Sequence, residues 1–502
     1  MPTGNNAAAV MTPGPVVAPD VPPPSVTFPS ITVSPTNSPL PTSPGQIIPT
    51  IGPVIAEGNP SPSPVALPES PTPVPTLPAV ATPSGPLPTF GPVLGPDYTP
   101  PPTATVVLPP PVTPGPSLTP GPMLRADLMG VQMHGFLTDD EFSAMLDRAA
   151  ELGMTWIKLQ IDWALYEPNR GEVTTAYAGM VLNVQRTRIR GFRTLLTIAR
   201  TPDWARPPDA RERESGPPAD PQDLAVFVAR LVRDIKPEFI DAIEVWNEPN
   251  LIREWRGASI TGAEYMRYFR AAYDAILREQ RLQRSPLRPD HRIMVITAGP
   301  APTVTLGDGS TLGDREWLQG LYDAGLGAYG LDVAVGAHPY GWANAPEARC
   351  CTAGPGVIGW FEHPSFYFRE TLDAYRAIMT RNQDTARKIW VTEFGWAAFD
   401  GLLRSDGSQA APAADVGWSG LLTQRQQAEY VLRAFRLAQQ PPYYEFLGPM
   451  FLWNLNYALV PGLIDGGQGE AAFSLLDGEG EPRPVFIRLR DAPKITPGQP
   501  PG

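Results

Sequence analysis

Cysteine is almost absent from this chain of 502 residues, and the two that occur, Cys350 and Cys351, are neighbours. Adjacent cysteines cannot join distant segments, so no long-range disulfide is expected, whether the pair forms free thiols or a vicinal disulfide. Histidine is also scarce, and no clustered ligand spacing or zinc set is found among the four residues His134, His291, His338 and His363. The sequence therefore argues against a metal-dependent hydrolase, and no metal or organic cofactor is expected.

Positive charge is missing from the first 124 residues, since the first basic residue is Arg125. The segment before Met123 also holds 37 of the 65 prolines, with Ser, Thr, Gly and Val at most other positions. Such a composition cannot bury enough apolar surface to offset its ordering entropy, and proline removes backbone hydrogen-bond donors. Residues 1–122 are therefore predicted to form a long, disordered, Pro/Thr/Ser-rich stalk or linker.

Long apolar runs are missing as well. No stretch of about 18 apolar residues predicts a membrane span, and the first residues lack the basic and apolar regions of a signal peptide. The net charge of −12 gives no indication of binding to nucleic acid or to an anionic membrane.

The repeated Thr-Pro and Ser-Pro pairs resemble the spacers of secreted and cell-surface carbohydrate enzymes, which favours an extracellular or cell-surface location. A cytoplasmic low-complexity tail is the alternative.

Residues 123–492 have a globular composition in which strand-like and helix-like segments alternate eight times. Eight apolar runs predict strands that are buried on both faces, at residues 128–134, 155–163, 193–199, 242–248, 292–298, 332–340, 388–396 and 449–457. Amphipathic stretches predict helices at residues 140–152, 178–190, 221–235, 262–280, 314–324, 365–381, 423–439 and 485–489. This pattern predicts an α/β fold of the (β/α)8 TIM-barrel class, followed by a flexible tail at 493–502. An open doubly wound sheet is the alternative, but no glycine-rich phosphate loop follows the first strand.

Two of the predicted strands end in a glutamate. Glu248 follows the run Ala-Ile-Glu-Val-Trp-Asn, and Glu393 follows the run Lys-Ile-Trp-Val-Thr. Active sites of this fold gather at the carboxyl ends of the strands, so these ends of the fourth and seventh strands should face each other across the barrel mouth. Glycosidic bond cleavage needs two such carboxyl groups, one to protonate the leaving oxygen and one to meet the positive charge at the anomeric carbon. The alternative for each glutamate is a strand-end residue in a surface ion pair.

These motifs resemble the clan A retaining glycoside hydrolases, the superfamily that includes the cellulase-type family 5 and the β-xylosidase-type family 39. The resemblance covers most of residues 125–490 and depends on Trp-Asn-Glu-Pro at 246–249, Thr-Glu-Phe-Gly-Trp at 392–396, His-Pro-Tyr at 338–340 and Trp453. It implies that Glu248 is the general acid/base and Glu393 the nucleophile. Many family 5 members have an arginine on or near the second strand, where this chain offers Lys158, and whether Lys158 reaches the site is left open.

The resemblance also implies substrate contacts around the two glutamates. Asn247 is expected to bind the sugar 2-hydroxyl, and Trp453 to form an apolar floor under the sugar ring. Tyr340 and His338 are expected to donate hydrogen bonds that keep Glu393 ionised, with structural strand-end pairs as the alternative. Trp396 is a further candidate for a sugar subsite, and His134 faces either the mouth or the barrel cap.

The sequence therefore predicts a retaining glycosidase that hydrolyses O-glycosyl compounds, cleaving β-linked oligosaccharides or polysaccharides by double displacement. Its carboxyl groups should lie about 5–5.5 Å apart, the spacing required for retention of the anomeric configuration. The alternative is a non-catalytic carbohydrate-binding barrel at the cell surface, although such a protein has no need for two opposed carboxylates. A monomer is expected.

Overall fold

The computed structural model describes residues 123–495, apart from residues 136, 211–214, 287 and 352–362. The predicted stalk at 1–122 and residues 496–502 of the predicted tail lie outside the described residues. Eight parallel strands form a closed barrel in chain order, and the last strand pairs with the first. They are β2 (Met129–Met133), β3 (Trp156–Asp162), β4 (Arg193–Ala199), β5 (Ala242–Val245), β6 (Met294–Thr297), β7 (Val333–Ala337), β8 (Ile389–Phe394) and β9 (Leu447–Leu452).

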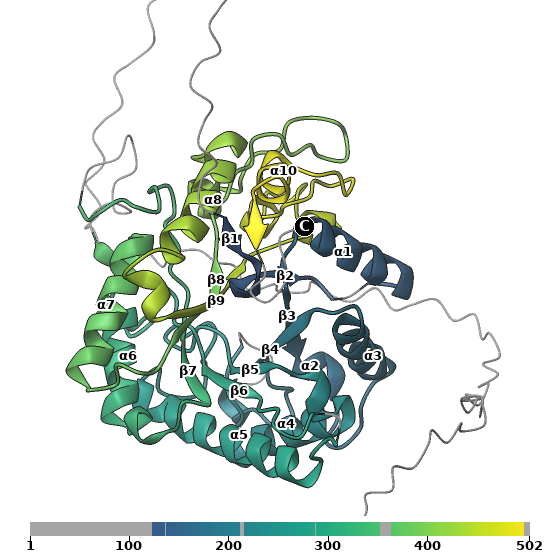
Figure 1. Cartoon of the computed structure of the whole chain (residues 1–502). Helices are drawn as coiled ribbons and strands as arrows, with labels where there is room; N and C mark the ends of the chain where they lie inside the picture. Colours follow the sequence, from purple (N-terminus) through teal and green to yellow (C-terminus); the bar gives the residue numbers. More distant parts are fainter. Residues whose placement is uncertain (1–122, 136, 211–214, 287, 352–362, 496–502) are drawn as a thin grey trace, which may run out of the picture. The chain divides into compact units, whose positions relative to one another are not determined.

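Helices follow the strands and enclose the barrel (Figure 1). Thr138 forms a capping box with Glu141 at the start of the first helix, and Asp220 caps the fourth, which begins with Pro221. The helices are α1 (Asp139–Glu151), α2 (Trp163–Tyr166), α3 (Thr175–Ile189), α4 (Pro221–Ile235), α5 (Gly262–Leu282), α6 (Asp314–Asp323), α7 (Phe368–Arg381), α8 (Gln424–Ala438), α9 (Gly469–Ala472) and α10 (Pro484–Arg490).

The predicted (β/α)8 barrel is confirmed, and every predicted strand occurs. Several strands end earlier than the apolar runs predict: β5 ends at Val245, three positions before Glu248, and β7 ends at Ala337, just before His338. Beyond these points the backbone leaves the sheet. Side chains there no longer alternate strictly between the two faces, so consecutive residues can turn toward the barrel mouth.

The interior of the barrel is filled in layers. One apolar layer gathers a buried side chain from each of seven strands, and its members are Trp156, Leu195, Ala242, Ile296, Ala334, Trp390 and Phe451. Strand side chains have a period of two, so the next inward position lies two residues further along each strand. On four strands that position holds a polar group: Lys158, Thr197, Glu244 and Thr392, all with no exposed surface. A polar layer therefore lies on top of the apolar one, toward the carboxyl ends of the strands.

The ends of the described chain pair with each other. β1 (Leu124–Arg125) and β10 (Lys494–Ile495) form a parallel two-stranded sheet beside the barrel. Lys494 also donates hydrogen bonds to the carbonyl oxygens of Leu489, Arg490 and Ala492 at the end of α10. Ordered structure thus continues to Ile495, past the boundary predicted at residue 492. Within the described part of the chain, no helix combines the length and the apolar character needed to cross a membrane.

Candidate active site

Glu248 reaches the barrel mouth through a sharp turn after β5. Trp246 and Glu248 both have left-handed backbone conformations, with φ of 79° and 44°, which side chains of this size rarely adopt. The turn is held by the indole of Trp246, which is buried, donates to the carbonyl oxygen of Glu254 at 3.0 Å and packs edge-on against Trp255. The backbone N–H of Glu248 donates to the carbonyl oxygen of Gly299 at 3.2 Å. Strained backbone held in this way is typical of functional sites.

Glu393 reaches the same place through an irregularity in β8. The pairing of β8 with β9 shifts register between Val391 and Phe394, and Glu393 lies within that interval. Its side chain is only 3% exposed and both of its oxygens are engaged: Lys158 Nζ lies 2.7 Å from Oε1, and the Tyr340 hydroxyl donates to Oε2 at 3.0 Å. Lys158 and Tyr340 therefore hold the Glu393 carboxyl group at both of its oxygens. The expected contact between Tyr340 and Glu393 is present.

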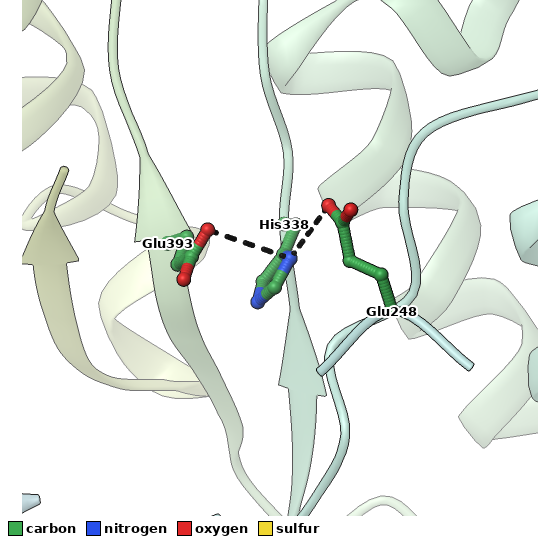
Figure 2. A group of neighbouring side chains, drawn as sticks. All are labelled: Glu248, His338 and Glu393. Carbon is green, nitrogen blue, oxygen red and sulfur yellow. Dashed lines mark hydrogen bonds and ion pairs between the residues drawn. The ribbon is translucent and has the colours of Figure 1, made fainter. Parts of the chain in front are cut away.

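His338 lies between the two glutamates, as Figure 2 shows. Its Nδ1 is 3.1 Å from Oε1 of Glu248 and 3.9 Å from Oε2 of Glu393, while Nε2 is 3.8 Å from Oε1 of Glu244. His338 was expected as a candidate hydrogen-bond donor to Glu393. In the structure its ring, which follows the end of β7, instead has Glu248 within hydrogen-bond distance, while Glu393 lies at ion-pair distance. Complete burial would lower the pKa of His338, but the charge of Glu393 and the contacts with Glu244 and Glu248 raise it to about 9.

One oxygen of Glu248 and one of Glu393 lie within 4.8 Å of each other, and both are within that distance of a ring nitrogen of His338. Side chains of these types also bind divalent metal ions. Here, however, the Lys158 ammonium group contacts Glu393 at 2.7 Å, and an Arg253 guanidinium nitrogen lies 3.6 Å from Oε2 of Glu248. A bound dication would be repelled by both cations. Two adjacent carboxyl groups with these cationic neighbours suit acid/base chemistry on a substrate better than metal binding.

Two buried charged residues lie beside the site: Lys158, whose reach was left open by the sequence, and Glu244, which was not singled out from it. Lys158 does reach the site, where its Nζ contacts Glu393 and also lies 3.4 Å from Oε2 of Glu244. Burial opposes ionisation of Glu244, but Lys158, His338 and Thr197 outweigh it and lower the pKa of Glu244 to about 2. A charged residue at an inward position of an otherwise apolar strand was the signal that could have revealed both residues.

Asn247 and Trp453 lie beside the two glutamates. Asn247 is 3% exposed, and its side-chain oxygen has no hydrogen-bond partner within the described part of the chain. The backbone N–H of Trp453 donates to the carbonyl oxygen of Phe394 at 2.9 Å, which places this residue next to Glu393. The unsatisfied amide oxygen of Asn247 is available for a substrate hydroxyl, and the sugar-binding roles of both residues stay predictions.

A cluster of aromatic rings lies beside Glu393. Tyr340 stacks on Trp342 at 5.9 Å, Trp342 meets Trp418 at 4.6 Å, and Phe473 lies 5.9 Å from Trp418 and 5.0 Å from Trp453. Trp418 belongs to the loop between β8 and α8, and sequence reasoning did not find it because nothing local marks that loop. Aromatic faces of this kind suit the apolar faces of sugar rings.

Trp396 lies elsewhere. Its indole N–H donates to the carbonyl oxygen of Asn344 at 2.8 Å, and its ring packs against Phe368, Phe394 and Tyr430 between the barrel and helices α7 and α8. With 1% of its surface exposed, the residue has the environment of a core side chain. Its contact with a substrate stays a prediction.

His134 lies at the mouth, after β2. Its backbone N–H donates to Oδ1 of Asn456 at 2.8 Å, and its ring is 5.8 Å from that of Tyr457, in the segment that follows β9. Burial lowers the pKa of the His134 imidazole to about 4, so this ring is neutral at pH 7. Whether the ring contacts a substrate or only caps the barrel stays a prediction.

Glu254 is a further buried carboxyl group, beside the turn that follows β5. Burial raises the pKa of Glu254 to about 8, and the negative charges of Glu248 and Glu393 add to that effect, while Arg253 and Arg200 oppose it. The group is therefore mostly protonated at pH 7, unlike Glu244 on the other side of the site.

No protein-family model and no curated protein matches this sequence. Among solved structures, the chain is similar to a family 39 glycoside hydrolase from the gut symbiont Bacteroides cellulosilyticus WH2, with 18% identity, a TM-score of 0.50 and coverage of 74% of this chain and 64% of that one. The chain shares the fold of that protein and spans less than two thirds of its length.

Two weaker likenesses accompany it. An exo-β-1,4-mannosidase from Opitutaceae bacterium strain TAV5 is 16% identical, with a TM-score of 0.46 and coverage of 73% of this chain and 58% of that one. The GH53 catalytic domain from Ignisphaera aggregans is also 16% identical, with a TM-score of 0.46 and coverage of 75% and 99%.

Proposed function

We propose that this chain is a retaining glycoside hydrolase that cleaves O-glycosidic bonds of β-linked glycans by a two-glutamate double displacement. The observation that carries the proposal is the pair Glu248 and Glu393, whose nearest oxygens lie within 4.8 Å at the mouth of the barrel. Such closeness fits the short carboxyl spacing of retaining enzymes better than the wider spacing that admits a water molecule for inversion. The fold of the family 39 relative is compatible with this chemistry.

Glu393 acts as the nucleophile in the first displacement. One of its oxygens attacks the anomeric carbon, the bond to the leaving oxygen breaks, and a covalent glycosyl ester forms. Lys158 and Tyr340 support this role because they stabilise the carboxylate before the attack. They also hold its orientation, since each engages a different oxygen.

Glu248 acts as the general acid and then as the general base. It transfers a proton to the leaving oxygen in the first step. In the second step it takes a proton from the water that attacks the anomeric carbon, and the bond from that carbon to Glu393 breaks. Its Oε1 lies 3.1 Å from Nδ1 of His338, and this contact holds the Glu248 carboxyl group at the mouth of the barrel. Two displacements at the same carbon restore the original anomeric configuration.

The aromatic cluster that includes Tyr340 and Trp453 is proposed to provide the ring faces on which sugars pack, and Asn247 to be the partner of a sugar hydroxyl. The prolines and hydroxyl residues of the first 122 residues support an extracellular or cell-surface location. The proposed substrate is therefore an oligosaccharide or polysaccharide outside the cell, bound by a monomer.

A substrate screen with product stereochemistry tests the proposal. The full chain is incubated with aryl β-glycosides and with soluble glucans, xylans and mannans, and the first product anomer is followed by proton NMR. We expect turnover of at least one β-linked substrate with a β-anomer as the first product, and none in the double variant Glu248→Gln, Glu393→Gln. An α-anomer would contradict retention, and sugar binding without any turnover would instead support the carbohydrate-binding barrel.

A further inference from the structure

Glu244 lies in the polar layer of the barrel interior, directly below the two glutamates, and neither displacement step uses it. Its side chain has no exposed surface. Two neighbouring strand regions anchor it: the Thr197 hydroxyl donates to Oε2 at 2.6 Å, and the backbone N–H of Gly299 donates to Oε1 at 3.1 Å. Its carboxylate is therefore fixed in place independently of the residues above it.

Two cationic side chains connect Glu244 to the site, one through each oxygen. Lys158 Nζ lies 3.4 Å from Oε2 of Glu244 and 2.7 Å from Glu393. His338 Nε2 lies 3.8 Å from Oε1 of Glu244, and its other nitrogen lies 3.1 Å from Glu248. The lysine therefore joins Glu244 to the proposed nucleophile, and the histidine joins it to the proposed acid/base.

We infer that Glu244 is a positioning residue whose carboxylate holds Lys158 against Glu393 and His338 against Glu248, and thereby divides the buried positive charge between the two catalytic glutamates. The inference rests on the proposed function. Without the charge of Glu244, the positive charge of Lys158 would act on Glu393 alone. The carboxylate of Glu393 would then be a weaker nucleophile, because Lys158 would neutralise more of its negative charge before the attack.

A purely structural role for Glu244 makes a different prediction. A carboxylate that only balances the charge of a buried lysine would change the stability of the barrel when replaced, because an unpaired buried charge is costly. It would leave the rate of the chemical step unchanged in protein that still folds. The kcat of a folded Glu244 variant therefore distinguishes the two roles: it falls if Glu244 is a positioning residue and stays unchanged if its role is only structural.

The test is Glu244→Gln in the full chain, which removes the charge and keeps the shape. We expect kcat to fall about 10- to 100-fold, the range seen when an outer-shell partner of an active group is lost, with little change in KM because the fully buried side chain cannot touch substrate. Glu244→Asp, which keeps the charge, should recover part of the loss. Glu279→Gln on α5, another buried glutamate, is the matched control and should leave kcat unchanged. An unchanged kcat in folded Glu244→Gln would overturn the inference.

A second readout separates this inference from the proposed function. The chain has only four histidines, so 15N-histidine labelling gives few signals, and the signal that disappears in His338→Gln identifies His338. We expect the pKa of His338 to fall by about one unit or more in Glu244→Gln. If the wild type hydrolyses no substrate but this shift occurs, the proposed function fails and the charge coupling stands. An active wild type with no shift and no change in kcat would remove Glu244 from the positioning role alone.

A second variant tests the inference even if Glu244→Gln does not fold. Thr197→Val removes the 2.6 Å hydrogen bond to Glu244 but keeps every charge. We expect a smaller, several-fold fall in kcat and a smaller shift of the His338 titration, since the carboxylate is less firmly held. A Thr197→Val protein with wild-type kcat and an unshifted His338 would overturn the inference.

Discussion

The ammonium nitrogen of Lys158 lies 2.7 Å from an oxygen of Glu393, although the two residues are 235 positions apart in the chain. Both side chains are almost completely buried, so the pair forms only when β3 and β8 meet inside the closed barrel. Removing one member of such a pair leaves an unpaired buried charge, which is strongly destabilising. The contact also means that the Glu393 side chain is held in place before any substrate arrives.

The first prediction concerns the nucleophile. Glu393→Ala should be almost inactive with every substrate, because no glycosyl ester can form. Added azide should restore part of the turnover by attacking the anomeric carbon directly, giving the inverted glycosyl azide. Product NMR in the presence and absence of azide checks this. A retained azide product from this variant would reverse the roles of the two glutamates.

The second prediction concerns the acid/base. Glu248→Ala should still form the glycosyl-enzyme from substrates with good leaving groups, because these need no proton, and should then stall at the hydrolysis of the ester. Substrates with poor leaving groups should fail at the first step. Burst kinetics with a series of aryl glycosides measure the difference, and azide should accelerate turnover with retention. Equal losses across the whole series would remove Glu248 from the acid role.

The third prediction concerns Tyr340, whose hydroxyl donates to Glu393 at 3.0 Å. A hydrogen bond to a charged group contributes about 1.5–3 kcal/mol, so Tyr340→Phe should lower kcat about 10- to 100-fold. Tyr322→Phe is the matched control, since its hydroxyl makes a 3.0 Å bond to the Asp384 carboxylate outside the site. Steady-state kinetics of both variants decide the matter, and equal activity in the two would contradict the assignment.

The fourth prediction concerns Glu254 and pH. A carboxyl group whose pKa rises from 4.5 unfolded to about 8 folded contributes stability that is complete below pH 4.5 and is lost as the pH rises through 8. Glu254→Gln has no charge to gain, so its melting temperature should exceed that of the wild type at pH 8. At pH 4.5 the two proteins should melt at similar temperatures. Thermal melts at both pH values test this, and a constant difference would show that the pKa of Glu254 is not raised.

Local patterns in the sequence were sufficient for the elements of the barrel. The run at 193–199 became β4 and the stretch at 221–235 became α4 with the predicted bounds, because hydrophobic periodicity and capping residues act within a few positions. The carboxyl ends of strands were predicted less well. β5 stops at Val245 because the left-handed turn at Trp246 takes the backbone out of the sheet, and the apolar run gives no sign of that turn.

The sequence by itself determined which residues could perform chemistry, since the motifs around Glu248 and Glu393 identified both glutamates, and the strand order predicted that they meet. Only the tertiary structure decided which partner each one has. Lys158, Glu244 and His338 come from three different strand regions, and whether a buried cation contacts one carboxylate or another depends on differences of about an ångström set by barrel closure. Electrostatic interaction in a buried site varies steeply over such distances, and a linear sequence does not contain them.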